Sequence, residues 1–249
     1  MVSGIELGLG LIGIGRPWGF AHPEVPPESQ AMELLERAVA LGVRYFDTAP
    51  SYGVSEERFG RFLAAHGSAG LRIATKFGEH WDAARAEPFV DHSFDALRRS
   101  LDASVQRLGR IDFLQLHKTT PQALASDDVA RAFAYARSLG IPAIGASVSD
   151  LESARIALTL QIIQVPYNSS SETFGPAIDE AAARGIWIAV NRPFAMGKML
   201  YEEHPISKAD AFRFILQKRF TGAILSGTKS PAHLEENVRA FAEASLLLA

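Results

Sequence analysis

The chain has 249 residues, with 25 basic and 28 acidic side chains, a net charge of −3 and 47% hydrophobic residues. This length and apolar content allow a large buried core, in one barrel-sized domain or in two smaller domains. The balanced charge argues against a nucleic-acid partner and against an anionic membrane surface. The absence of cysteine excludes disulfides, thiolate chemistry and Cys-ligated zinc.

The first fifteen residues, MVSGIELGLGLIGIG, are apolar but carry no basic residue and are interrupted by five glycines. They therefore lack the pattern of a secretory signal, and no membrane-spanning segment follows them. We expect a cytoplasmic protein whose partners are small molecules.

Short apolar runs alternate with amphipathic stretches along the whole chain, and this change of period predicts alternating strands and helices. The predicted strands are 9–14, 43–47, 71–75, 111–116, 142–146, 161–165, 186–190 and 222–225. The predicted helices are 28–41, 55–66, 92–108, 122–139, 150–159, 175–184, 208–219 and 231–243. Gly42, Gly140 and Gly185 each stand between a helix and the next strand, as expected where a helix ends.

Strict alternation of apolar strands with helices indicates parallel strands covered by helices. Eight such units predict an α/β protein with a single domain, a (β/α)8 TIM barrel over residues 1–249. The alternative is an open doubly wound sheet with a glycine-rich phosphate loop. Residues 8–13 match the glycine spacing of that loop, but Gly15, Pro17 and Gly19 prevent the helix that should follow. We interpret these glycines as bends around the first strand.

Four polar residues follow three consecutive predicted strands. Asp47 ends the second strand, Lys76 the third and His117 the fourth, while Tyr52 lies in the loop after the second. Each has an ordinary structural explanation by itself, such as a turn, a surface lysine or a satisfied core histidine. A barrel would nevertheless bring all four to one mouth, where catalytic residues of such barrels lie.

The segments YFDTAPSYG, SEERFGRFL, IATKFG and DFLQLHK, followed by IPAIGASVSD, IIQVPYN and ILSGTKSPAHLEENV, resemble the aldo-keto reductase superfamily in order and spacing. The resemblance covers nearly the whole chain. It implies an NADP(H)-dependent oxidoreductase that interconverts an aldehyde or ketone and an alcohol by hydride transfer, with no Rossmann fold.

The resemblance also implies roles for the four polar residues. Tyr52 would be the general acid and base, Lys76 and Asp47 its tuning pair, and His117 the residue that orients the carbonyl. A phenol has an ordinary pKa of about 10, and a nearby ammonium is expected to lower it. A neutral His117 that donates one N–H would polarise the carbonyl oxygen.

A cofactor site is carried over in the same way. Its expected residues are Ser147, Gln164, Asn191, Arg192, Ser226, Gly227, Thr228, Lys229, His233, Glu236 and Asn237, and Lys198 could also approach the pyrophosphate. Three positions depart from the family pattern. Val148 stands where an asparagine is frequent, Asn191 where many members have a tyrosine that stacks on the nicotinamide, and His233 where many have arginine. We expect NADPH, held at its 2'-phosphate chiefly by Lys229, with NADH also tolerated.

Four aromatic residues, Trp18, Phe20, Phe77 and Trp81, follow the first and third predicted strands. They are expected to form an aromatic wall for the substrate or a seal under the loops. We expect the long C-terminal loop of many relatives to be missing and the N-terminal hairpin to be reduced to residues 2–7. An open mouth predicts bulky or varied carbonyl compounds.

Two other functions stay open at this point. A barrel of this family could keep its cofactor as a regulatory or redox-sensing ligand with little turnover, which the departures at Val148 and Asn191 slightly favour. A metal-dependent hydrolase could use Asp47, His117, His66 or His80, but no HxH or HExxH spacing occurs and no metal site is expected.

Overall fold

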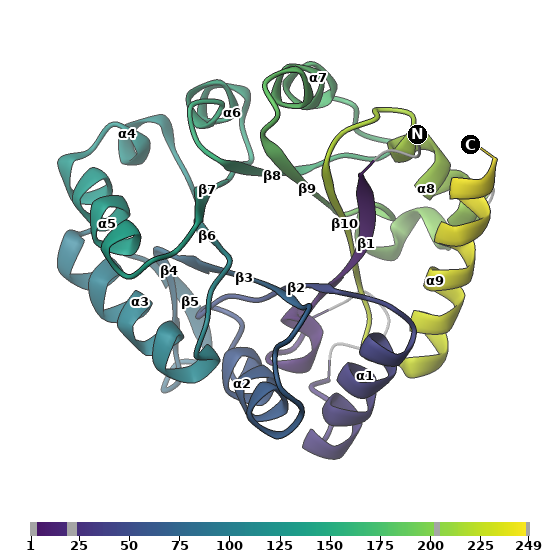
Figure 1. Cartoon of the computed structure of the whole chain (residues 1–249), viewed down its shortest axis with the longest axis horizontal. Helices are drawn as coiled ribbons and strands as arrows, with labels where there is room; N and C mark the ends of the chain where they lie inside the picture. Colours follow the sequence, from purple (N-terminus) through teal and green to yellow (C-terminus); the bar gives the residue numbers. More distant parts are fainter. Residues whose placement is uncertain (1–3, 19–23, 202–204, 248–249) are drawn as a thin grey trace.

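The protein folds around a closed barrel of eight parallel strands, in the order β1-β10-β9-β8-β7-β6-β3-β2. The structure is a computed structural model and describes residues 4–18, 24–201 and 205–247. Figure 1 looks into the barrel, with the helices arranged in a ring around it. The predicted single-domain (β/α)8 fold is confirmed.

The barrel strands begin and end close to the predicted positions, with one exception. They are β1 (Ile5–Gly10), β2 (Tyr45–Asp47), β3 (Arg72–Phe77), β6 (Phe113–Leu116), β7 (Ala143–Ser147), β8 (Ile162–Pro166), β9 (Trp187–Asn191) and β10 (Gly222–Gly227). The ring closes because β1 pairs with β10 in parallel register, from Ile5 with Gly222 to Gly10 with Gly227.

The helices lie outside the barrel. They are α1 (Glu28–Ala40), α2 (Ser55–His66), α3 (Phe94–Leu108), α4 (Pro121–Leu124), α5 (Asp127–Ser138), α6 (Leu151–Ala157), α7 (Gly175–Ala183), α8 (Lys208–Leu216) and α9 (Pro231–Leu246). Short 3-10 segments, η1 (Ile12–Ile14) and η2 (Ala195–Leu200), follow β1 and β9. Within the described ranges, no helix has both the length and the hydropathy needed to cross a membrane.

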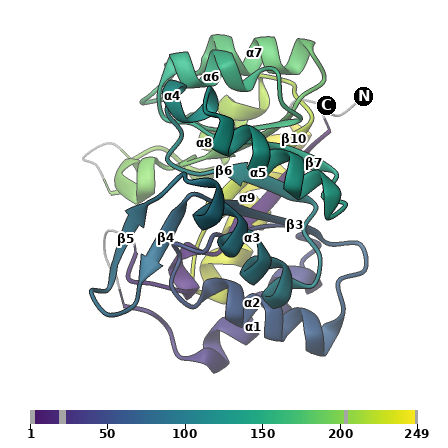
Figure 2. The same cartoon turned by 90° about the vertical axis from the view of Figure 1, so that its left-hand side faces the viewer.

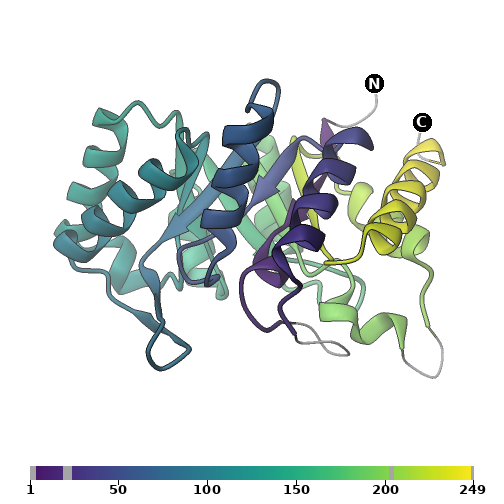
Figure 3. The ribbon, with the colours of Figure 1, turned by 90° about the horizontal axis from the view of Figure 1, so that it is seen from below.

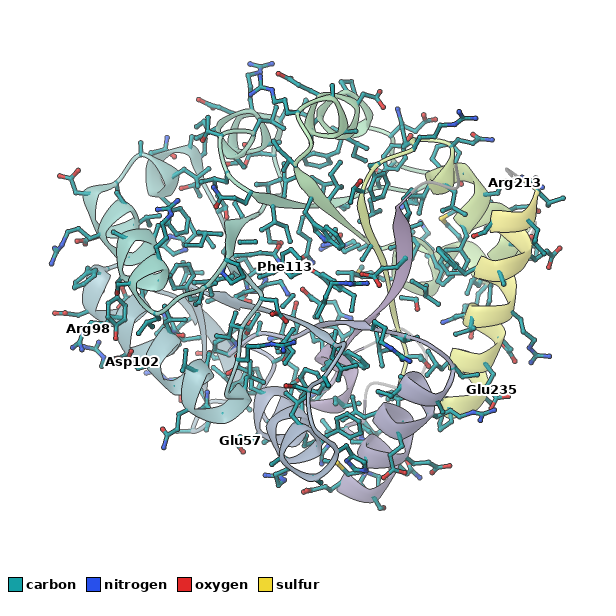
Figure 4. The ribbon with its side chains drawn as sticks, viewed as in Figure 1. Glu57, Arg98, Asp102, Phe113, Arg213 and Glu235 are labelled. Carbon is teal, nitrogen blue, oxygen red and sulfur yellow. The ribbon has the colours of Figure 1, made fainter. Side chains whose placement is uncertain are left out.

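Side chains on the strands alternate between the barrel interior and the helix layer, as expected of a pleated strand. Tyr45 faces inward, and its ring centroid lies 5.4 Å from that of Phe113 and 6.0 Å from that of Trp187. Its neighbour Phe46 faces outward and stacks on Phe59 of α2 at 5.1 Å. Figure 4 shows Phe113 near the centre of the ring and the labelled charged side chains on the surrounding helices.

The predicted first strand, 9–14, is wrong. The strand runs over 5–10, because IELGLG is mostly buried and pairs with β10 along its whole length. Residues 5–7 therefore belong to the barrel instead of an N-terminal hairpin. The rest of the predicted strand becomes η1, after Leu11 N donates to the Asp47 carbonyl oxygen at 2.8 Å.

Two further predictions need correction. The predicted helix 122–139 is divided into α4 and α5, because Ser126 Oγ accepts from Val129 N at 3.2 Å and caps the start of α5. The region after β3, predicted as loop, contains an antiparallel hairpin of β4 (Glu79–Asp82) and β5 (Glu87–Val90). This hairpin projects from the same end of the barrel as η1 and η2 (Figures 2 and 3).

Candidate functional site

A cavity of about 770 Å³ lies at the carboxyl ends of the barrel strands. The last residues of β1, β2, β7, β9 and β10 line it, namely Gly10, Asp47, Ser147, Asn191 and Gly227. Its volume is in the range of small-molecule binding sites. The mouth of the barrel is therefore the candidate site, at the end where the strand order placed the polar residues.

Asp47 and Lys76 form a buried ion pair at the base of this cavity. Lys76 Nζ donates to Asp47 Oδ2 at 2.6 Å and to the Thr48 carbonyl oxygen at 3.0 Å. The side chains of Lys76 and Asp47 are 1% and 4% exposed. Burial acts to lower the pKa of Lys76, but the charge and hydrogen bond of Asp47, together with the contribution of Tyr52, outweigh it, so the net pKa is raised. Lys76 is thus an ammonium at neutral pH.

Tyr52 lies against this ion pair, and Lys76 Nζ is 4.9 Å from the centre of its ring. The expected lowering of the Tyr52 pKa is wrong in its net direction. Burial raises the pKa of Tyr52, and the Lys76 ammonium only partly opposes the rise. At neutral pH Tyr52 is therefore a protonated phenol, which can donate a hydrogen bond or a proton.

His117 is held beside Tyr52 by a carboxylate that the sequence did not single out. His117 Nδ1 lies 3.1 Å from Glu79 Oε2 and 3.4 Å from Ser51 Oγ, and the other Glu79 oxygen is 3.5 Å from Lys118 Nζ. Burial lowers the pKa of His117 well below its ordinary value, and the positive charges of Lys76 and Lys118 add to this. His117 is therefore neutral at neutral pH, as predicted.

The turn between β3 and β4 positions Glu79. Gly78 has a φ of +99°, and a Cβ atom there would lie 2.5 Å from the ring of His92. His92 Nε2 in turn lies 2.9 Å from the His117 carbonyl oxygen, and His117 N donates to the Phe77 carbonyl oxygen at 2.9 Å. Glycine is required at this turn because of both its backbone angle and this close approach.

Most of the predicted cofactor residues line the cavity. They are Ser147, Gln164, Asn191, Arg192, Gly227, Thr228, Lys229, His233, Glu236 and Asn237. Ser226 does not, because the alternation along β10 turns its side chain toward the helices, where it is fully buried. Lys198 is also absent from the lining, whereas Val148 is present.

The far end of the cavity carries two lysines with different partners. Lys229 Nζ donates to the Glu24 carbonyl oxygen at 2.5 Å and so connects the loop after β10 to the segment before α1. Lys208, at the start of α8, pairs with Glu236 of α9 at 2.6 Å. The sequence analysis missed Lys208, which no motif distinguishes from an ordinary surface lysine.

The predicted aromatic wall is only partly present. Trp18 lines the main cavity and, with Trp81, a neighbouring recess of about 320 Å³. Phe77 does not contribute, because it faces the helix layer, is fully buried and packs on Phe133 of α5. Arg16 also lines the cavity, and the sequence analysis missed it. Its guanidinium carbon lies 5.4 to 5.9 Å from the ring centres of Trp18, Tyr52 and Trp81. Phe20 lies outside the described residues.

The histidines considered for a metal site lie apart. His66 pairs with Glu36 on the outside of the barrel at 3.3 Å, and His80 stacks on Phe89 of the hairpin. Among the residues that the structure describes, no group of three or more His, Cys, Asp or Glu side chains could hold a metal ion. The hydrolase hypothesis therefore has no geometric support.

Comparison with known proteins agrees with this geometry. The family model for the Aldo/keto reductase family matches residues 6–210. A solved structure assigned as an aldo-keto reductase from Pseudomonas aeruginosa is 30% identical, with a TM-score of 0.82 over 96% of this chain and 89% of that chain.

Two curated relatives extend the comparison. An aldo-keto reductase of Strobilurus tenacellus is 33% identical over 122 residues, which are 47% of this chain and 34% of that protein. This chain therefore spans about a third of the length of that relative. An L-galactose dehydrogenase of Arabidopsis thaliana is 24% identical over 258 residues, which cover 87% of this chain and 79% of that protein.

The closed eight-stranded barrel and the family match over residues 6–210 together define the class of protein. The chain belongs to the aldo/keto reductase family.

Proposed function

We propose that this protein is an NADP(H)-dependent oxidoreductase that interconverts a small aldehyde or ketone and the corresponding alcohol. The observation that carries the proposal is the cluster of Asp47, Lys76, Tyr52 and His117 at one end of the 770 Å³ cavity, whose other end has the lysine pair Lys208 and Lys229. The end with Tyr52 and His117 suits a small substrate beside the reactive part of a dinucleotide. The end with the two lysines suits the phosphate groups of that dinucleotide.

The lining residues fit such a cofactor. Three buried side-chain oxygens on the cavity wall have no hydrogen-bond partner among the described residues, namely Gln164 Oε1, Asn191 Oδ1 and Asn237 Oδ1. Buried polar atoms normally have partners, so these oxygens are consistent with a polar ligand. Gln164 and Asn191 would hold the nicotinamide end, while Lys229 and His233 would hold the 2'-phosphate. Asn191 cannot stack as a tyrosine would.

When bound, the dinucleotide would supply or accept a hydride. The protein's own contribution is to position the substrate oxygen and to manage its charge. Tyr52, a protonated phenol at neutral pH, would donate to the carbonyl oxygen and transfer its proton as that oxygen becomes negative. Lys76, held as an ammonium by Asp47, would stabilise the phenolate left behind.

The first test is a titration of NADPH and of NADH against the protein, followed by tryptophan fluorescence, since Trp18 lines the cavity. A panel of aldehydes and ketones is then added, and the loss of NADPH absorbance is recorded. We expect binding and turnover, and at least ~100-fold lower kcat in Tyr52→Phe, in line with the size of general acid catalysis. NADPH binding without consumption across the panel would instead indicate a regulatory or redox-sensing barrel, and Tyr52→Phe with full activity would disprove the assigned role.

A further inference from the structure

Arg16 borders both the cavity that contains Tyr52 and the neighbouring recess of about 320 Å³. Its guanidinium carbon lies 5.9 Å from the ring centre of Tyr52. It also lies 5.4 Å from the ring centre of Trp18 and 5.5 Å from that of Trp81, two residues that line the recess. A small molecule whose carbonyl group lies at Tyr52 can therefore place a second group beside Arg16.

Backbone contacts fix the start of the Arg16 side chain relative to Tyr52. A Cβ atom on Gly15 would lie 1.9 Å from the Tyr52 carbonyl oxygen, and one on Gly53 would lie 2.4 Å from the Gly15 carbonyl oxygen. Val54 N donates to that same Gly15 oxygen at 3.1 Å. Only glycine allows approaches as close as these. The segment that carries Arg16 is therefore packed directly against the segment that carries Tyr52.

The charge of Arg16 has no anionic partner within the described ranges. Its Nε atom is buried and has no hydrogen-bond partner there, although buried polar atoms normally have one. The carboxylates of the adjacent hairpin face other cations. Glu79 Oε1 lies 3.5 Å from Lys118 Nζ, and Asp82 Oδ2 lies 3.8 Å from Arg85 Nε. Arg16 is thus a cation at the substrate end of the cavity that is available to a ligand.

The aromatic rings around Arg16 leave the edge of its guanidinium available. An arginine that stacks on an aromatic face keeps its N–H groups in the guanidinium plane, where they can bind a carboxylate at two points. Trp18 and Trp81 also displace water from the group, which strengthens its attraction to an anion. One guanidinium balances one negative charge. A carboxylate carries that charge, whereas a phosphate monoester carries about 1.5 to 2 at pH 7.

We propose that Arg16 binds a carboxylate on the substrate, so that the protein acts on carbonyl compounds with a carboxylate a few bonds from the carbonyl carbon, or on the corresponding hydroxy acids. This inference rests on the proposed function and names the substrate class of the same site. The carbonyl oxygen would lie at Tyr52 and His117, and the carboxylate would accept hydrogen bonds from Arg16 at the entrance to the recess.

A purely structural role for Arg16 predicts a different result. Its contacts with Trp18 and Trp81 connect the segment after η1 to the hairpin of β4 and β5. If Arg16 only supported this connection, its removal would weaken the binding of charged and neutral substrates equally. A carboxylate site instead requires a loss confined to charged ligands.

Binding tests the site independently of turnover. Benzoate and benzamide have nearly the same shape, but only benzoate is charged. Each is titrated against the full chain, with and without NADPH, and followed by the fluorescence of Trp18 and Trp81. We expect benzoate to bind at least about tenfold more tightly, the scale of hydrogen bonds to a charged group. Equal affinities under both conditions would overturn the proposal.

Variants with a matched control assign that preference to Arg16. Arg16→Met should abolish it, because methionine keeps an unbranched apolar side chain but has no charge. Arg85→Met, which removes an exposed cation from the tip of the same hairpin, should leave it unchanged. A preference for benzoate that persists in Arg16→Met would contradict the assignment. If Arg16→Met does not fold, Arg16→Lys should weaken benzoate binding, since lysine lacks the planar fork, and unchanged binding would count against the site.

The kinetic test uses NADPH with 4-oxobutanoate and 4-carboxybenzaldehyde, each compared with its methyl ester. Arg16→Met should lower kcat/KM for the acids about 10- to 100-fold, chiefly through KM, and change it for the esters less than about threefold. Equal losses for acids and esters would mean that Arg16 only supports the structure. Wild-type turnover of esters and acids at equal kcat/KM would overturn this inference and leave the proposed function intact. No turnover of any carbonyl compound would disprove the proposed function, while the benzoate titrations would still decide whether Arg16 forms an anion site.

Discussion

Replacing Lys76 with methionine should destabilise the protein more than its size change suggests, because it leaves the Asp47 carboxylate buried without a cation. At the observed 2.6 Å, and with an effective dielectric constant of about 20, the attraction is about 6 kcal/mol. Part of this is offset by the desolvation of both groups. Removal of one partner from a buried pair typically costs about 3–5 kcal/mol, and we expect Lys76→Met to fall in this range.

A double-mutant cycle separates the charge effect from packing. Asp47→Asn combined with Lys76→Met removes both charges at nearly constant volume and should recover at least half of the loss caused by Lys76→Met alone. Urea unfolding followed by tryptophan fluorescence gives the free energy of unfolding for each variant. A double variant as unstable as the sum of the two single variants would refute the reasoning, since it would show that the pair does not interact.

Three further predictions concern other parts of the molecule. Gly60→Ala should destabilise the protein by about 1–3 kcal/mol despite a better helix former, because its Cβ would lie 2.1 Å from the Arg107 carbonyl oxygen; an unchanged urea midpoint would contradict this. Because the folded-state pKa of His117 lies well below its ordinary 6.5, the unfolded state binds more protons below about pH 6.5. Stability should therefore fall with decreasing pH there by up to about 1.4 kcal/mol per pH unit, a slope that His117→Asn lacks in urea unfolding at several pH values. Lys229→Ala should raise the Kd for NADPH about tenfold or more and leave that for NADH nearly unchanged in fluorescence titrations, and equal losses for both would remove Lys229 from the 2'-phosphate site.

The barrel was predictable because its signal repeats. Apolar runs of strand length alternate with helical spacing through the whole chain, and a single misplaced boundary does not change that order. The first strand was misplaced because the charged Glu6 interrupts the apolar character of 5–10, while the run 9–14 has no charged residue but continues into η1 at Ile12–Ile14. Pairing with β10 decided the outcome, and such pairing is not visible in local sequence.

The sequence predicted which residues lie near the cavity, because the end of a strand determines the end of the barrel at which a residue lies. Asp47, Lys76 and His117 meet because each lies at or next to the end of one of three neighbouring strands. Phe77 and Ser226 were assigned wrongly because a position near the end of a strand does not reveal whether the side chain points into the barrel or toward the helices. Each lies next to an inward-facing residue, so its own side chain points toward the helices and is buried there. Ser226 was included because it belongs to a segment that resembles the family. Such a segment can match through its backbone as well as through its side chains.

The net pKa of Tyr52 and the partner of His117 depended on three-dimensional packing. The ammonium beside the phenol was anticipated, but the extent of burial that reverses its effect requires the folded structure. Glu79 follows Gly78 in a segment without a motif, and only the hairpin brings its carboxylate to Nδ1. A carboxylate after a glycine that follows a strand does not by itself indicate a site residue, which explains why Glu79 was missed.

The barrel closes where its first strand, β1, pairs with its last strand, β10. The ion pair of Arg37 on α1 with Glu235 on α9, at 2.8 Å, also links the first and last helices. During synthesis on the ribosome, a chain that lacks β10 would have two open edges, on β1 and β9, with unpaired backbone groups exposed to other chains. The ring can be completed only after its final strand emerges. Cotranslational folding of this protein should therefore end in one late cooperative step, and nascent chains stalled before residue 222 should be prone to aggregate.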